Sequence, residues 1–236
     1  VASISGNDFG TFNLLQYSEE LDQAAWSTSS LTITPNDAIA PDGNQTAEKW
    51  QNTSTTGIIS QSLTKAASAT TYTASVWIKS NDSTNFSFTI DDGATINRGR
   101  CRFNITSGEL IDEVNEGNFT NTSGSITAYP NSWYRITVTT TTNTTTTVRF
   151  RAFFSGNNDI VYIWGAQLEE SSTATPYVKS DVTWTSRASN ATYYDYTGTL
   201  RKSSYNLLLG SEDMETSLWS KIRLAAFGSG SIANDI

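Results

Sequence analysis

The sequence predicts an all-β protein built as an antiparallel sandwich or barrel, and three observations support this. Residues that suit a pleated surface are abundant: many Thr, with seven Trp, ten Tyr and ten Phe among 236 residues. Several stretches alternate between apolar and polar residues, which is the period of a strand with one buried face. Turn-forming residues separate these stretches at short intervals, and no helical pattern lies between them.

The clearest alternation is TYTASVWIK, whose apolar face includes Tyr72 and Val76 and whose opposite face includes Trp77. Six stretches are expected to be strands: Thr71–Lys79, Phe86–Ile90, Arg100–Thr106, Tyr134–Thr140, Val148–Phe154 and Val161–Leu168. Turns are expected at Asp91-Asp92-Gly93, Ser107-Gly108, Ser123-Gly124, Pro130-Asn131 and Ser155-Gly156-Asn157. The run Thr139–Thr147 is expected to join two strand ends as a tight hairpin.

One short helix is expected near the N-terminus. Ser18 is a suitable cap, and Glu19 and Glu20 follow in the first turn, where acidic side chains interact favourably with the helix dipole. Leu21 would then share one face with two alanines, and Trp26 would end the helix.

A long-range repeat predicts the domain organisation. NLLQYSEELDQAAW at Asn13–Trp26 recurs in register as NLLLGSEDMETSLW at Asn206–Trp219. This spacing is too long for a solenoid unit and indicates a duplicated domain. The expected parts are an N-terminal segment (1–12), a module (13–180), a linker (181–205) and the incomplete start of a second, homologous module (206–236). The chain is therefore expected to be a piece of a longer protein.

Composition excludes several kinds of site. The chain has no His, which excludes a Ser-His-Asp triad and His-ligated zinc or haem, and one Cys, Cys101, which excludes an internal disulfide. Its net charge of −8 argues against nucleic acid as a partner. No apolar run is long enough for a membrane span, so no membrane insertion is expected.

Several motifs resemble one module type. They are the opening Asn13–Trp26, Ala40–Trp50 (APDGNQTAEKW), the TYTASVWIK strand, Ser132–Ile136 (SWYRI), Tyr162–Glu170 (YIWGAQLEE) and the adjacent Ser186–Leu200. Together they resemble the carbohydrate-binding-module-like jelly-roll domains of bacteriophage virion proteins, especially tail fibres. The resemblance implies an antiparallel jelly-roll β-sandwich, followed by a linker and the start of a second similar module.

The resemblance also implies a function. The first hypothesis is a non-enzymatic phage virion structural protein, a tail fibre or fibre-like tail component located in the virion and assembled in the bacterial host cytoplasm. Its partners would be other copies of itself, with a homotrimer favoured, and other tail proteins. The alternative is host attachment through a glycan-binding module that holds a host surface polysaccharide. A remote alternative is a polysaccharide depolymerase.

Arginine is distributed unevenly. Arg100 and Arg102 are two residues apart, as are Arg149 and Arg151, so each pair should project from one sheet face while Cys101 points into the core. Such an arginine strip would bind a carboxylated or sulfated glycan, or an acidic neighbouring subunit, through forked hydrogen bonds. The alternative is cross-strand pairing with Asp and Glu on the solvated face.

Trp77 is the aromatic candidate for the same site. An exposed Trp77 beside polar residues would suit stacking on a sugar ring, whereas the alternative is that it covers a sandwich edge or meets a partner chain. Trp26, Trp133 and Trp164 are expected to be structural.

The acidic residues suggest no catalytic site. Adjacent carboxylates such as Glu19-Glu20 and Asp91-Asp92 point to opposite faces of a strand, so they are not the paired acids of a glycosidase. No cofactor is expected. The resemblance to jelly-roll modules implies that a structural calcium ion could bind, with Glu19 and Glu169 as its ligands. No calcium-loop motif in the sequence supports such a site.

Overall fold

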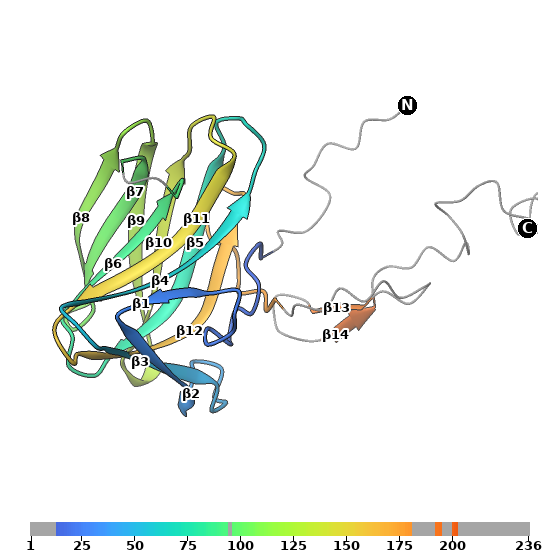
Figure 1. The fold of residues 1–236 in the computed structure, drawn as a ribbon. Helices are drawn as coiled ribbons and strands as arrows, with labels where there is room; N and C mark the ends of the chain where they lie inside the picture. The colour runs from blue at the N-terminus through green and yellow to red at the C-terminus, as the bar shows by residue number, and fades with distance from the viewer. Residues whose placement is uncertain (1–12, 94–95, 181–191, 195–199, 203–236) are drawn as a thin grey trace, which may run out of the picture. The chain divides into compact units, whose positions relative to one another are not determined.

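The computed structural model describes residues 13–93, 96–180, 192–194 and 200–202. Two six-stranded antiparallel sheets pack face to face, as Figure 1 shows. Sheet A contains, in spatial order, β1 (Ser27–Ser29), β4 (Thr56–Thr64), β11 (Thr147–Ser155), β6 (Asn85–Asp91), β7 (Arg98–Asn104) and β8 (Glu109–Glu116). Sheet B contains β2 (Leu31–Ala38), β3 (Ala47–Asn52), β12 (Ile160–Glu169), β5 (Thr71–Ser80), β10 (Trp133–Thr141) and β9 (Thr120–Tyr129).

The chain crosses repeatedly between the two sheets. β4, β5 and β6 alternate between them, and so do β10, β11 and β12. This confirms the predicted jelly-roll sandwich, and all six predicted strands are present with small shifts of their ends. The expected hairpin at Thr139–Thr147 is wrong, because β10 and β11 belong to different sheets and the threonine run spans the gap between them.

One predicted turn is also wrong. Ser123-Gly124 lies in the middle of β9, whereas the other turns lie between strands or at their ends. Gly124 is needed for close packing, because a Cβ at that position would lie 2.7 Å from the Sγ of Cys101. The glycine therefore marks a close approach of β9 to β7 and not a reversal of the chain.

The core lies between the inner faces of the sheets. It is rich in phenylalanine, and Phe88 packs edge-to-face on Phe150 with their ring centroids 4.9 Å apart. Cys101 is fully buried there, as the alternation predicted, and burial raises the pKa of its thiol to about 12. It therefore behaves as a small apolar side chain.

The expected helix at Ser18–Trp26 is absent. The segment consists of turns, in which Glu20 N donates to Tyr17 O, Gln23 N to Glu20 O and Trp26 N to Gln23 O. Ser18 does not act as a cap, since its Oγ bonds to the Tyr177 hydroxyl at 2.7 Å. Tertiary contacts overrode local propensity here, because successive turns bury the side chains of Leu15, Leu21 and Trp26 in the core.

Asn13, the first residue that the structure describes, bonds to distant parts of the module in an arrangement that we call the Asn13 clasp. Asn13 Nδ2 donates to the carbonyl oxygens of Ala166 (2.9 Å) and Val178 (3.1 Å). Its Oδ1 accepts from the backbone N–H groups of Leu15 (3.1 Å) and Leu168 (3.2 Å). The clasp therefore joins the start of the module to its last strand.

A separate small unit contains the antiparallel pair β13 (Thr192–Tyr194) and β14 (Leu200–Lys202). Both strands fall in the stretch that sequence reasoning assigned to a linker. The second copy of the repeat lies outside the described residues, so the domain boundaries stay predictions. The structure also has a short 3₁₀ helix, Pro130–Ser132, and in the described part of the chain no helix is long and apolar enough to cross a membrane.

Candidate functional site

The four predicted arginines lie on the outer face of sheet A, and the structure adds Arg98 to them. β7 contributes Arg98, Arg100 and Arg102, and β11 contributes Arg149 and Arg151. β6 runs between these two strands, so the arginine strands are next-but-one neighbours and do not pair directly. We call this set of five residues the arginine face (front sheet in Figure 1).

Most of the arginine face is paired with carboxylates. Arg98 pairs with Glu116 and Arg102 with Asp112, both from β8. Asp91 of β6, whose side chain is 1% exposed, receives two hydrogen bonds from Arg149, at 2.6 and 3.1 Å, and lies 3.8 Å from Arg151. The cross-strand pairing considered as an alternative is therefore present for four of the five arginines.

Arg100 differs from the other four. It makes no ion pair with any residue in the described part of the chain. Its Nε, like that of Arg98, has no hydrogen-bond partner there. The register places Arg151, Thr89 and Arg100 in one row across three strands, and Val114 follows in β8. This middle row contains two guanidinium groups and no carboxylate.

Polar and aromatic groups surround the middle row. The Thr89 hydroxyl is buried and has no hydrogen-bond partner among the described residues. Half-buried Phe153 lies on the same face of β11 as Arg151, with the Arg151 Cζ 5.2 Å from its ring centroid. Burial lowers the pKa of Arg151, and the Asp91 carboxylate offsets part of this effect. The arginine face thus combines hydrogen-bond donors with a partly exposed aromatic ring.

Trp77 is buried, which favours the alternative that it covers the sandwich over the one in which it stacks on a sugar. Its side chain is 5% exposed, and the rings of Trp164 and Tyr177 pack against it with centroids 5.3 and 5.5 Å away. The guanidinium of Arg135 covers its ring at 4.5 Å. Sugar stacking requires an open ring face, which this packing does not provide. Trp77 also lies on sheet B, on the opposite side of the sandwich from the arginine face.

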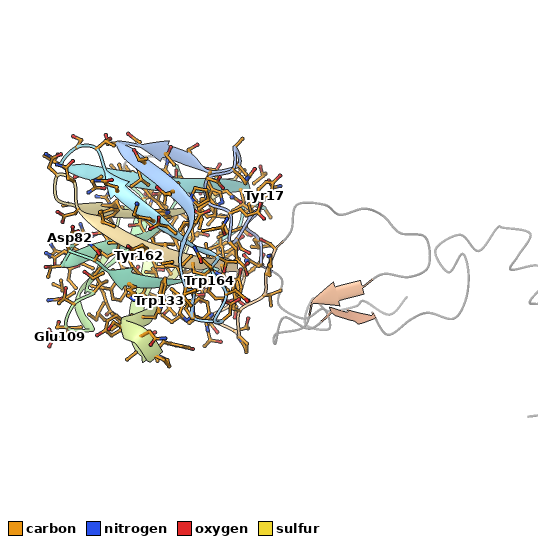
Figure 2. All side chains as sticks on the ribbon, turned by 90° about the horizontal axis from the view of Figure 1, so that it is seen from below. Tyr17, Asp82, Glu109, Trp133, Tyr162 and Trp164 are labelled. Atoms are coloured by element: carbon orange, nitrogen blue, oxygen red, sulfur yellow. The ribbon has the colours of Figure 1, made fainter. Side chains whose placement is uncertain are left out.

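Trp77 belongs to a second, smaller apolar cluster on the outer face of sheet B. Trp133 and Trp164 are its other large members, and Figure 2 shows both near Tyr162 in the view from below. The chain after β12 returns across this face, where the Thr73 hydroxyl donates to Ser171 O (2.9 Å). The structural role predicted for Trp26, Trp133 and Trp164 agrees with their burial.

Sequence reasoning missed a groove on the same outer face of sheet B. The returning segment covers β5 and β12 but leaves β9 and β10 open, and the resulting groove has a volume of about 390 Å³. Tyr129 and Arg135 line it, and Ser172–Ala174 lie along one side. The groove could not be predicted because its floor includes β9. The sequence pattern Ser123-Gly124 indicated a turn in the middle of that strand.

Glu19 and Glu169 do not form a calcium site. The Glu169 carboxylate accepts hydrogen bonds from the backbone N–H (3.1 Å) and the hydroxyl of Thr175. Glu19 is bound by the Tyr177 hydroxyl (3.1 Å) and by Lys179 (2.9 Å). Within the described ranges, no group of three or more acidic or Cys side chains is placed to hold a metal ion. The residues present therefore do not fit the ion.

Comparison with known proteins gives structural neighbours only. No protein-family model matches the chain, and no curated protein sequence matches it. Among solved structures, the chain is similar to TmCBM61 in complex with β-1,4-galactotriose (TM-score 0.43, 13% identity, covering 68% of this chain and 99% of that one). It is also similar to the CBM22-1 xylan-binding domain of Xyn10C from Paenibacillus barcinonensis (TM-score 0.42, 14% identity, 70% and 97%).

A third neighbour is the enzymatically active domain of bacteriophage CBA120 tailspike protein 4 (TM-score 0.43, 10% identity), where the match covers 66% of this chain and 21% of that one. The neighbours are thus mainly carbohydrate-binding module sandwiches, and the phage origin of this chain stays a prediction.

Proposed function

We propose that this protein is a non-catalytic glycan-binding module that holds a carboxylated or sulfated polysaccharide on the arginine face. The observation that carries the proposal is the middle row of sheet A, where Arg100 and Arg151 lie on either side of Thr89 without a carboxylate between them. Arg100 in particular has no ion-pair partner among the described residues.

The charge balance of this surface favours an anionic ligand. The rows of paired residues from Arg98 to Arg102 on the outer face of sheet A contain five arginines and three carboxylates. The carboxylates are Asp91, Asp112 and Glu116. The surface therefore has a surplus of positive charge on a chain whose net charge is −8. A guanidinium group presents its donors as a planar fork that matches the oxygens of a carboxylate or sulfate.

The neighbouring groups suit a sugar in particular. The ring of Phe153 is partly exposed and offers an apolar surface beside the guanidinium of Arg151. All three carboxylates on this surface are engaged by arginines. No carboxylate there is left to attack or protonate a glycosidic bond, which favours binding over hydrolysis.

The proposal predicts that Arg100 is needed for binding to acidic polysaccharides. We expect Arg100→Ala to weaken binding to polygalacturonate and dextran sulfate at least tenfold, measured by isothermal titration calorimetry at fixed salt concentration. Lys79→Ala is the matched control, because it removes one positive charge from sheet B and should change affinity less than twofold. Binding of the unmodified protein should also weaken steeply with added salt.

Two outcomes would contradict this function. If Arg100→Ala and Lys79→Ala weaken binding equally, the interaction is non-specific electrostatics and no site exists on the arginine face. If neither polysaccharide binds the unmodified protein in low salt, the function is wrong. A reducing-end assay with both polysaccharides tests the depolymerase alternative, and we expect no release of reducing ends.

A role as a virion tail component is the second candidate function. It is supported by the Asn13 clasp: the same motif begins again at Asn206, with Asn, Ser and Trp in register. Because the first copy uses these residues to fold a module, a second copy favours a chain of serial modules such as a tail fibre. Host attachment through the arginine face is compatible with that role, and location in the virion tail is part of this proposal.

A further inference from the structure

The groove on sheet B has a well-defined origin. The segment that follows β12 returns over β5 and β12, where Val178 N donates to Gln167 Oε1 at 2.7 Å and the Thr73 hydroxyl donates to Ser171 O at 2.9 Å. It does not extend over β9 and β10, so these two strands form an open floor beside the wall at Ser172–Ala174. The volume of about 390 Å³ is within the range of small-molecule sites.

Most of the residues that line the groove carry a hydroxyl group. Eight of its eleven residues are Ser, Thr or Tyr, and Arg135 is the one charged residue among them. On the floor, the hydroxyls of Ser125 and Thr137 bond to each other at 2.7 Å. One bond between two hydroxyls uses one donor and one acceptor, so the pair keeps a donor and several acceptor positions for a ligand. A surface of this kind complements the hydroxyls of a neutral sugar.

Tyr129 and Arg135 provide fixed groups at one end of the groove. The side chain of Tyr129 is 39% exposed, and its ring is packed against Trp77 with an 81° angle between the ring planes. Arg135 Nη2 donates to Thr175 O at 2.6 Å and to Ser75 Oγ at 3.0 Å, while its Cζ lies over the Trp77 ring. Both side chains are therefore held in place before any ligand arrives, which lowers the entropic cost of binding.

We propose that this hydroxyl-lined groove is a second binding site, specific for a neutral oligosaccharide that stacks on Tyr129 and bonds to the Ser125–Thr137 hydroxyl pair. The site is independent of the arginine face, because it lies on the opposite sheet and uses none of the same residues. Trp77 contributes indirectly, as the support against which Tyr129 and Arg135 are packed.

The test uses nuclear magnetic resonance of the ¹⁵N-labelled chain with three neutral probes: cellohexaose, xylohexaose and mannohexaose. We expect at least one probe to shift the amide signals of residues 123–139 and 172–174 with saturable binding. Tyr129→Ala should weaken that binding at least tenfold, whereas Tyr129→Phe, which keeps the ring, should change it less than threefold. Ser125→Trp, a substitution at an exposed position that fills the groove, should abolish the shifts.

The experiments test the two proposed sites independently. Arg100→Ala should leave neutral-probe binding unchanged, and Tyr129→Ala should leave binding to polygalacturonate unchanged. The second site is refuted if no neutral probe shifts the groove signals, or if the shifts persist in Ser125→Trp. It is also refuted if Tyr129→Phe and Tyr129→Ala weaken binding equally, because stacking on the ring would then play no part.

Discussion

Glu48 shows how one residue can make the stability of the module depend on pH. Its side chain is 1% exposed at a 250 Å³ acidic pocket that Glu19, Glu20, Asp22 and Lys179 also line. Oε1 accepts a 2.8 Å hydrogen bond from Leu21 N, and Oε2 has no partner among the described residues. Burial, together with the nearby Asp22 carboxylate, raises the pKa of Glu48 to about 8.

The raised pKa predicts that alkaline pH destabilises the protein. Between pH 4.5 and 8 the unfolded chain releases the Glu48 proton while the folded chain keeps it, so the free energy of unfolding falls as pH rises. This group alone should account for a loss on the order of 5 kcal/mol across that range. Glu48→Gln keeps an acceptor for Leu21 N but does not titrate.

Urea unfolding of both proteins at several pH values measures the effect. The variant should match the unmodified protein near pH 4.5 and be clearly more stable at pH 9. Parallel stability curves for the two proteins would show that Glu48 titrates normally.

At the scale of elements, the Asn13 clasp joins a segment without regular structure to β12, an inner strand of sheet B. Asn13 forms four hydrogen bonds, and the segment it holds contributes Leu15, Leu21 and Trp26 to the core. The segment is therefore a structural part of the module although its backbone is neither helix nor strand.

Removal of the clasp should destabilise the module without removing a strand. We expect Asn13→Ala to lower the free energy of unfolding by roughly 2–4 kcal/mol, because it leaves the partners of four part-buried hydrogen bonds unsatisfied. Gln16→Ala is the control, since the exposed Gln16 takes part through its backbone, which bonds to Gln61. Equal stability of the two variants, measured by urea unfolding, would show that the clasp contributes nothing.

At the scale of the whole molecule, the tail-fibre role predicts self-association. β8 is an edge strand of sheet A, and its side chains include exposed Leu110 (36%) and Ile111 (46%), which a partner chain would cover. A tail-fibre role predicts that the 236-residue protein forms a homotrimer. Size-exclusion chromatography with light scattering should then give three times the mass of one chain, whereas a stable monomer would argue strongly against the fibre.

The fold class could be predicted from local patterns alone, because the two-residue alternation in strands such as β5 and β7 reflects local backbone geometry. The sequence also placed Arg100, Arg102, Arg149 and Arg151 on outward faces, since alternation with buried Cys101 and Phe150 fixes their direction. It did not find the edge strands β8 and β9, where weak burial leaves little periodic signal.

The pairing of arginines with carboxylates depends on the folded chain, because Asp91 contacts both Arg149 and Arg151 through strands that are distant in the sequence. The tertiary structure also decided the burial of Trp77. Alternation places Trp77 on the polar face of its strand, but the segment that returns after β12 covers that face and leaves β9 and β10 open. Which half of a sheet is covered depends on the path of chain almost one hundred residues away, and no local pattern records it.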